Sequence, residues 1–103
     1  MQTPVHYSSD VEGGAPVQVR YAIAGRLNLA EYLTFVAERA HWLGLSGWAA
    51  AAGPQSVTVV AAGPEALVGA LEMACTLGPQ DALIEDLRAT PSSDAVPVGF
   101  RLR

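Results

Sequence analysis

Apolar and polar residues alternate in the first patterned stretch of the chain. Its apolar side chains share one face: Val17, Val19, Tyr21 and Ile23. A period of two predicts a β-strand with one covered face over residues 17–24. After Gly25 the apolar spacing changes to steps of three and four residues, which predicts an amphipathic helix over residues 29–43. Asn28 and Glu31 have the spacing of a capping box at its start, and Gly44 suits its left-handed end.

The rest of the chain supplies a second helix and further strands. Residues 49–52 and 56–61 flank the turn Gly53-Pro54-Gln55 and predict a hairpin. Gly63-Pro64-Glu65 opens the second helix and Gly78-Pro79 ends it. Its buried face is expected to carry Leu67, Val68, Leu71, Ala74, Cys75 and Leu77. Residues 82–89 and 96–103 predict two last strands, the second with one apolar face made of Val98, Phe100 and Leu102.

The resulting order, β-α-β-β-α-β-β, predicts an α+β fold. It is typical of a ferredoxin-like sandwich, in which two helices cover one face of a mainly antiparallel five-stranded sheet. Residues 1–16 lack periodicity and are expected to form a mobile N-terminal extension. Residues 17–103 form one domain, because a chain of 103 residues has room for a single core.

Composition and charge narrow the classes of function. The formal net charge is −4, and all six cations are scattered arginines, so no basic stripe favours nucleic acid. No apolar run is long enough to span a membrane, and a cytoplasmic protein is expected. The single cysteine, Cys75, is expected to be a buried small hydrophobe. Neither a metal nor a cofactor is predicted, since no cysteine cluster exists.

Four segments carry a resemblance to a known family. They are Val19–Leu27, Leu43–Trp48, Val57–Pro64 and the closing Gly99–Arg103. The second, Leu-Gly-Leu-Ser-Gly-Trp, is the most specific, because an apolar pattern alone would not fix it. On these segments the chain resembles the acylphosphatase family from Val17 to Arg103. The resemblance implies the same sandwich fold.

The resemblance also implies a catalytic loop, which this chain alters. In acylphosphatases the loop reads Gly-Arg-Val-Gln-Gly-Val-Gly-Phe-Arg. Its backbone binds the phosphoryl group, and its last arginine neutralises the charge, while an asparagine after the Gly-Trp segment positions the attacking water. Gly25 and Arg26 retain the opening pair. The two later glycines are replaced by Leu29 and Glu31, the arginine by Leu33, and the asparagine by Ala51.

Three functions follow from this comparison. The first is an acylphosphatase-like domain that has lost hydrolysis and binds a small molecule or a partner protein. Its candidate binding residues are Arg26, Asn28, Leu29, Tyr32, Leu33, Trp48 and Ala51. The second is an enzyme of different chemistry on the same scaffold, with Glu31 as a possible base and His41 as a further candidate. The third is a weak but genuine acylphosphatase. For Glu31, Asn28 and His41 a helix-end role is the favoured interpretation.

Overall fold

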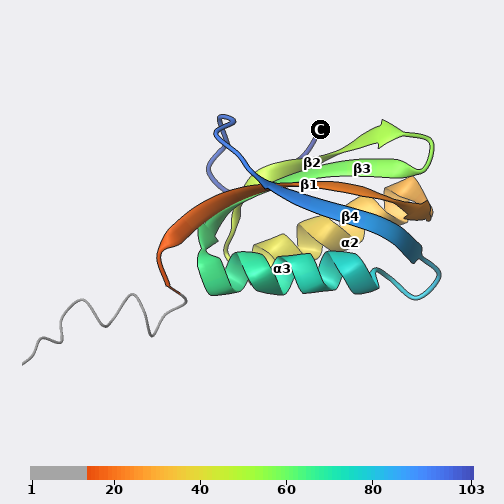
Figure 1. The fold of residues 1–103 in the computed structure, drawn as a ribbon, viewed down its shortest axis with the longest axis horizontal. Coiled ribbons are helices and arrows are strands. Elements are labelled where there is room, and N and C mark those ends of the chain that lie inside the picture. Colours follow the sequence, from red (N-terminus) through yellow and green to blue (C-terminus); the bar gives the residue numbers. More distant parts are fainter. Residues whose placement is uncertain (1–13) are drawn as a thin grey trace, which may run out of the picture.

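A computed structural model describes residues 14–103, and Figure 1 shows its ribbon. The elements in chain order are β1 (Pro16–Arg26), α2 (Leu29–Trp42), β2 (Ser46–Gly53), β3 (Ser56–Pro64), α3 (Glu65–Leu77), β4 (Leu83–Pro91) and β5 (Phe100–Leu102). The mobile extension expected for residues 1–16 falls almost wholly on residues 1–13, which lie outside the described residues. The first strand already begins at Pro16.

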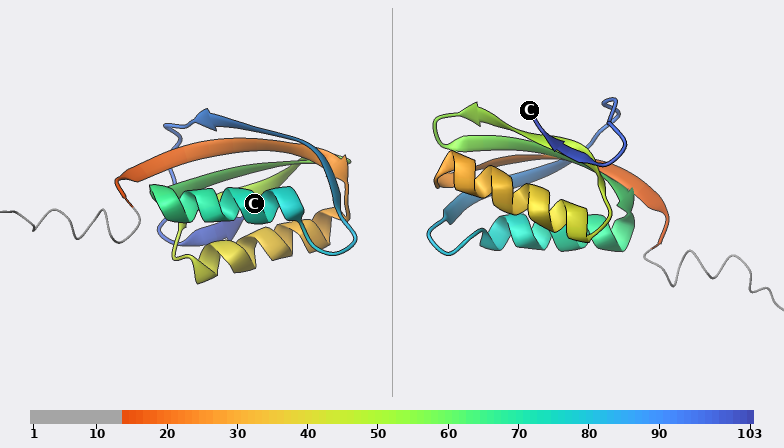
Figure 2. Two further views of the ribbon diagram at one scale, coloured as in Figure 1. Left: turned by 60° about the horizontal axis from the view of Figure 1, so that its bottom comes forward. Right: turned by 180° about the vertical axis from the view of Figure 1, so that it is seen from behind.

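The five strands form one sheet in the order β4-β1-β3-β2-β5. The β1–β3, β1–β4 and β2–β3 pairs are antiparallel, and the short β5 runs parallel to β2. Both helices pack against the same face of this sheet, as the two further views in Figure 2 show. The α+β sandwich expected from the sequence is therefore confirmed, including its predicted hairpin, β2–β3.

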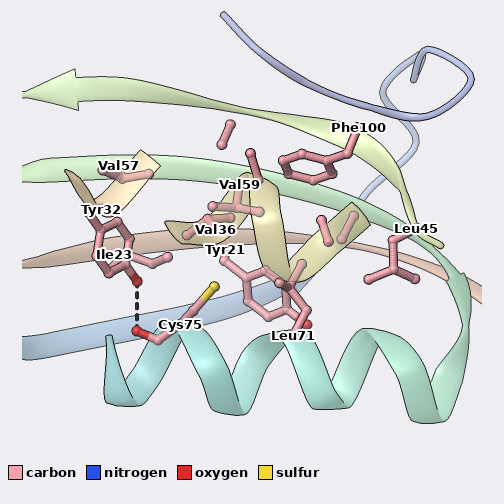
Figure 3. Packing of buried hydrophobic residues seen from close by; sticks show 14 of the residues in the cluster. Tyr21, Ile23, Tyr32, Val36, Leu45, Val57, Val59, Leu71, Cys75 and Phe100 are labelled. Atoms are coloured by element: carbon pink, nitrogen blue, oxygen red, sulfur yellow. Dashed lines mark hydrogen bonds between the residues drawn. The ribbon is translucent and has the colours of Figure 1, made fainter. Parts of the chain in front are cut away.

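Strand alternation decides which residues form the core. On β1 the predicted inward set faces the helices, with Tyr21 and Ile23 each 1% exposed. The neighbouring β3 contributes Val57, Val59 and Ala61 on the same face. From the helices come Tyr32, Val36 and Ala40 on α2, and Val68, Leu71 and Cys75 on α3 (Figure 3). Each large apolar side chain buried in this way contributes about 1.5–3 kcal/mol of transfer free energy.

Helix α2 begins and ends as the sequence predicts. The Asn28 side-chain oxygen accepts a hydrogen bond from the Glu31 backbone N–H at 3.0 Å, which fixes the N-cap. Gly44, just beyond the helix, has a φ of 67°, the left-handed conformation that glycine adopts most readily.

Gly47 explains why the Leu-Gly-Leu-Ser-Gly-Trp segment is so specific. Its φ is 140°, and a Cβ at this position would collide with the Val60 carbonyl oxygen of β3. The strand β2 begins before the alanine run because Gly47 pairs with Ala61 on one side and Phe100 on the other. The predicted strand 49–52 is thus the end of a longer one.

Two expectations about apolar faces were wrong. Leu77 was expected on the buried face of α3 but is 71% exposed, because at about 100° per residue it lies well away from the face that Val68, Leu71 and Cys75 share. The last strand was expected over residues 96–103, but β5 spans only Phe100–Leu102. Val98 precedes the turn at Gly99 (φ 80°) and is 93% exposed, so only Phe100 of its predicted face is buried.

A tyrosine side chain supplies a hydrogen bond to a backbone carbonyl group near the end of α3. The Tyr32 hydroxyl, buried in the core, donates to the Cys75 carbonyl oxygen at 2.7 Å, the dashed line in Figure 3. Residue 79 would normally supply the helical N–H to this carbonyl, but it is a proline and has none. Tyr21 makes a longer bond, 3.5 Å, to the Val68 carbonyl, which lies in the middle of α3.

Tyr32→Phe should therefore destabilise the protein more than Tyr21→Phe. Removing the Tyr32 hydroxyl leaves a buried carbonyl without a partner, which costs about 1–3 kcal/mol. The Val68 carbonyl keeps its helical N–H, so we expect Tyr21→Phe to cost less than about 1 kcal/mol. Urea unfolding followed by circular dichroism measures both. Equal losses would contradict this account of the Tyr32 hydroxyl.

Stability should also fall at alkaline pH through the buried thiol. Burial raises the pKa of Cys75 to about 12. As the pH rises above the pKa of a free thiol, about 8.5, the unfolded chain loses this proton while the folded chain keeps it, so the free energy of unfolding decreases. We expect the thiol to contribute a slope approaching about 1.4 kcal/mol per pH unit between pH 9 and 10. Burial also raises the pKa values of Tyr21 and Tyr32, which add a slope of the same sign as the pH approaches 10. In Cys75→Ala the thiol's share of the slope should disappear and the share of the tyrosines should remain, whatever that variant costs at pH 7. A slope unchanged by the substitution would contradict the assignment.

Candidate functional site

The turn from β1 into α2 is closed by the β2–β3 hairpin. The side chain of Gln55, in the hairpin turn, accepts from the Leu27 N–H at 3.0 Å and donates to the Leu27 carbonyl at 3.2 Å. The Gln55 carbonyl also accepts from the Gly25 N–H at 3.1 Å. A phosphate-binding loop needs such N–H groups free to point at the anion. Two of them are occupied here by one glutamine.

Further donors and the nearby cation are also engaged. The Glu31 N–H belongs to the Asn28 cap. The Arg26 guanidinium is 83% exposed and lies 3.9 Å from the Glu85 carboxylate of β4, an exposed pair that contributes little stability. Gly25 has a packing role, because a Cβ there would collide with the Leu83 carbonyl oxygen. The opening Gly-Arg pair is therefore explained by contacts with β4.

The two positions that the resemblance assigns to the catalytic arginine and asparagine carry no polar side chain. Leu33 is half-buried and packs on the core from α2. Ala51 lies opposite Val57 in the β2–β3 register, so its methyl group faces the helical side of the sheet, where it is exposed. Neither side chain can neutralise an anion or orient a water molecule.

The expected apolar pocket does not form as one site. It was predicted from Leu29, Tyr32, Leu33, Trp48 and Ala51. Tyr32 is fully buried in the core beneath the sheet, whereas Trp48 lies opposite Val60 and Arg101, on the face that no helix covers. The sheet itself separates these two aromatic residues. Trp48 faces the open side because consecutive side chains of a strand point to opposite faces, and its neighbour Ala49 points into the core.

Glu31 and His41 lie too far apart to act on one reacting atom. They are ten residues apart on α2, which corresponds to about 15 Å along the helix axis. Glu31 is exposed and borders a shallow hollow of about 440 Å³ with Thr34 and Pro79. His41 Nε2 lies 2.9 Å from the Phe100 carbonyl oxygen and so donates to it, tying α2 to β5.

The sequence analysis missed an aromatic cluster on the outer surface of α2. The Arg39 guanidinium lies 5.0 Å from the Phe35 ring centroid and 5.9 Å from that of Trp42, which is 86% exposed. This cluster borders a hollow of about 560 Å³ that also includes Glu38 and His41. The four- and three-residue spacing of these side chains on one helix was the available signal.

Two further features, a metal site and a membrane-spanning helix, are absent from the described part of the chain. Within residues 14–103 no group of three or more His, Cys, Asp or Glu side chains could hold a metal ion. No helix of that range has the length and apolar content needed to cross a membrane.

Comparison with known proteins assigns the chain to a family. A sequence profile of the acylphosphatase family, described as "Acylphosphatase", matches residues 19–102. An acylphosphatase of Rhodospirillum rubrum is 37% identical over 78 residues, covering 76% of this chain and 86% of the relative. The chain belongs to the acylphosphatase family. A second relative, acylphosphatase 2 of Ralstonia nicotianae, is 33% identical over 88 residues, covering 84% of this chain and 93% of the relative.

Solved acylphosphatase structures share the fold. The acylphosphatase of Coxiella burnetii superposes with a TM-score of 0.79 at 20% identity, covering 85% of this chain and 93% of its own. That of Bacillus subtilis gives a TM-score of 0.76 at 24% identity, with 84% and 98% covered. At these identities the likeness concerns the fold alone, whereas the sequence relatives establish the family.

Gln55→Ala should open the turn that the acylphosphatase family uses as its catalytic loop. Because the Leu27 N–H loses its acceptor, we expect its amide hydrogen exchange to accelerate, with a loss of about 1 kcal/mol in unfolding free energy. Hydrogen exchange followed by NMR measures the first and urea unfolding the second. Gln80→Ala, in the exposed segment between α3 and β4, is the matched control. Unchanged protection of Leu27 in Gln55→Ala would contradict the role given to this side chain.

Proposed function

We propose that this domain is a non-hydrolytic member of the acylphosphatase family that acts by binding a partner protein. The observation that carries the proposal is the closed turn, in which Gln55 holds the Leu27 N–H while Leu33 and Ala51 stand at the positions of the catalytic arginine and asparagine. A binding role retains the fold. It requires neither a phosphoryl-binding backbone, nor a charge-neutralising arginine, nor a water-positioning asparagine.

The energetic case against hydrolysis combines independent losses. A preorganised donor aimed at developing negative charge is worth roughly 10²–10³ in rate. At this turn the cation and the water-positioning amide are missing, and the Leu27 and Glu31 N–H groups are already engaged. Arg26 cannot substitute for the cation, because its guanidinium lies toward Glu85 on β4. No other arginine lies on β1 beyond Arg20 or in the first half of α2.

Partner binding is favoured over a small-molecule pocket by the shape of the surface. Two hollows of about 560 and 440 Å³ lie along the outer side of α2 and share Phe35 and Glu38. They are bordered by exposed side chains, such as Trp42 and Glu31, rather than enclosed in the fold. A small ligand is usually bound in a cavity that covers most of its surface.

Hydrolysis of benzoyl phosphate, followed by its ultraviolet absorbance, tests the proposal directly. We expect the protein to leave the spontaneous rate unchanged at enzyme concentrations near that of the substrate. The Rhodospirillum rubrum acylphosphatase, purified in the same way, is the positive control. Hydrolysis that is lost in Arg26→Ala would overturn the proposal and indicate a genuine acylphosphatase.

A gain-of-function variant tests why activity is absent. Combining Leu29→Gly, Glu31→Gly, Leu33→Arg, Ala51→Asn and Gln55→Ala rebuilds the loop and frees its donors. We expect this variant to raise the hydrolysis rate about 100-fold or more above the spontaneous rate. The same variant with Leu33→Gln in place of Leu33→Arg is the control, because it lacks only the cation. A folded variant without turnover would contradict the assignment of the loss to these positions.

A further inference from the structure

The sheet face opposite the helices gathers most of the positive charge of the chain. One row across this face runs Arg20, Val60, Trp48 and Arg101, from β1 through β3 and β2 to β5. The next row begins at Arg88, opposite Ala22. Arg103 lies over the Trp48 ring and so joins the same face. Four of the six arginines of the chain are therefore on the side that Figure 1 shows free of helices.

Trp48 lies at the centre of this arginine face. The Arg103 guanidinium is 4.5 Å from the indole centroid, and that of Arg20 is 5.8 Å away. Trp48 itself is only 9% exposed. Among the buried side-chain nitrogen and oxygen atoms of residues 14–103, its Nε1 is the one without a hydrogen-bond partner. A buried hydrogen-bond donor without an acceptor is rare in native proteins, so an acceptor is expected for this N–H group.

The arginines differ in whether they are already neutralised. Arg20 pairs with Asp94 at 2.6 Å, and Arg88 pairs with Asp86 at 3.1 Å. Arg101 and Arg103 have no carboxylate within ion-pair distance in the described part of the chain. Arg101 lies in β5 and Arg103 directly follows it, with its N–H bonded to the Ala49 carbonyl, so the two are about 6.8 Å apart along extended backbone.

We propose that the arginine face binds an extended acidic segment of a partner protein. Carboxylates at alternate positions of an extended peptide repeat every two residues, the same spacing of about 6.8 Å as Arg101 and Arg103. Each guanidinium can receive one carboxylate in a forked pair, and an acceptor of the peptide reaches the Trp48 Nε1–H once it displaces the covering Arg103. This inference rests on the proposed binding function and names its partner class.

The neighbouring surface suits a polypeptide better than a nucleic acid. The row that begins at Arg88 lies next to the Trp48 row, and it continues through the small residues Ala22, Thr58 and Ala50, which lie in register across three strands. A peptide backbone can approach such a floor closely. A polyphosphate chain would instead need many unpaired cations, whereas this face offers two on a protein of net charge −4.

The test follows the two indole N–H signals of the ¹⁵N-labelled full chain by NMR. Trp42→Phe assigns them, since the chain has two tryptophans. The probe is a blocked seven-residue peptide that alternates threonine with glutamate. We expect it to move the Trp48 indole signal and leave that of Trp42 in place. The same peptide with glutamine in place of glutamate should have no effect.

Matched variants separate the site from general charge. Arg101→Gln with Arg103→Gln should weaken the peptide at least tenfold, because both forked pairs are lost. Ala70→Glu with Gln80→Glu, at two exposed positions away from this face, lowers the net charge by the same amount and should leave the affinity within twofold. Equal weakening in both pairs, a shift of the Trp42 signal alone, or no shift would each overturn the inference.

Two further readouts distinguish the possible failures. A thymidine oligonucleotide that binds more tightly than the peptide at 150 mM salt would overturn the choice of partner class. An unmoved Trp48 signal in a protein that does not hydrolyse benzoyl phosphate refutes only the peptide site. A moved signal in a protein that does hydrolyse it refutes the non-hydrolytic function and leaves the peptide site in place.

Discussion

The register between β1 and β3 is the constraint on which the rest of the structure depends. These two strands form the middle of the sheet, and Tyr21 lies opposite Val59 while Arg20 lies opposite Val60. A slip of one residue would turn every side chain of β1 to the other face. The same pairing therefore assigns the core to the helical side and the arginines to the open side. It is held by the burial of Tyr21 and Ile23, with Val17 and Val19 packed against the same core, and none of the ion pairs of the described residues joins β1 to β3.

The closed turn is a consequence of the same register. Ala24, the last pair of the β1–β3 ladder, lies opposite Ser56, so the hairpin turn that precedes Ser56 is carried to the end of β1. Gln55 then has both its carbonyl and its side chain within reach of the turn. In an anion-binding loop these donors would need to stay free. In this chain a single residue of the hairpin engages them, and the apolar Leu33 packs against the core.

Local patterns in the sequence predicted the elements well, because strands and helices have distinct periods. The alternation of Val17 to Ile23 and the Asn28 cap needed no tertiary information, and both are confirmed. What the sequence could not predict depended on pairing between distant residues. Trp48 follows the pleat of β2 to the open face, and only the sheet order decides that the arginines of β1 and β5 meet it there. The shortness of β5 was likewise hidden, since Val98 has the same period as Phe100.

The uneven distribution of charge gives the domain a preferred side for an anionic partner. The helical layer presents Glu31, Glu38, Glu65 and Glu72, none of which has an ion-pair partner in the described residues, whereas the open face carries four arginines and two paired aspartates. An acidic segment is repelled by the first surface and attracted by the second, so long-range electrostatics orients it before contact. The turn that serves as the catalytic loop in acylphosphatases belongs to the acidic side in this chain, with Glu31 in the first turn of α2. The charge distribution and the closed turn therefore lead to the same expectation. The negative groups of an anionic partner are repelled from the turn that corresponds to the family's catalytic loop and attracted toward Trp48.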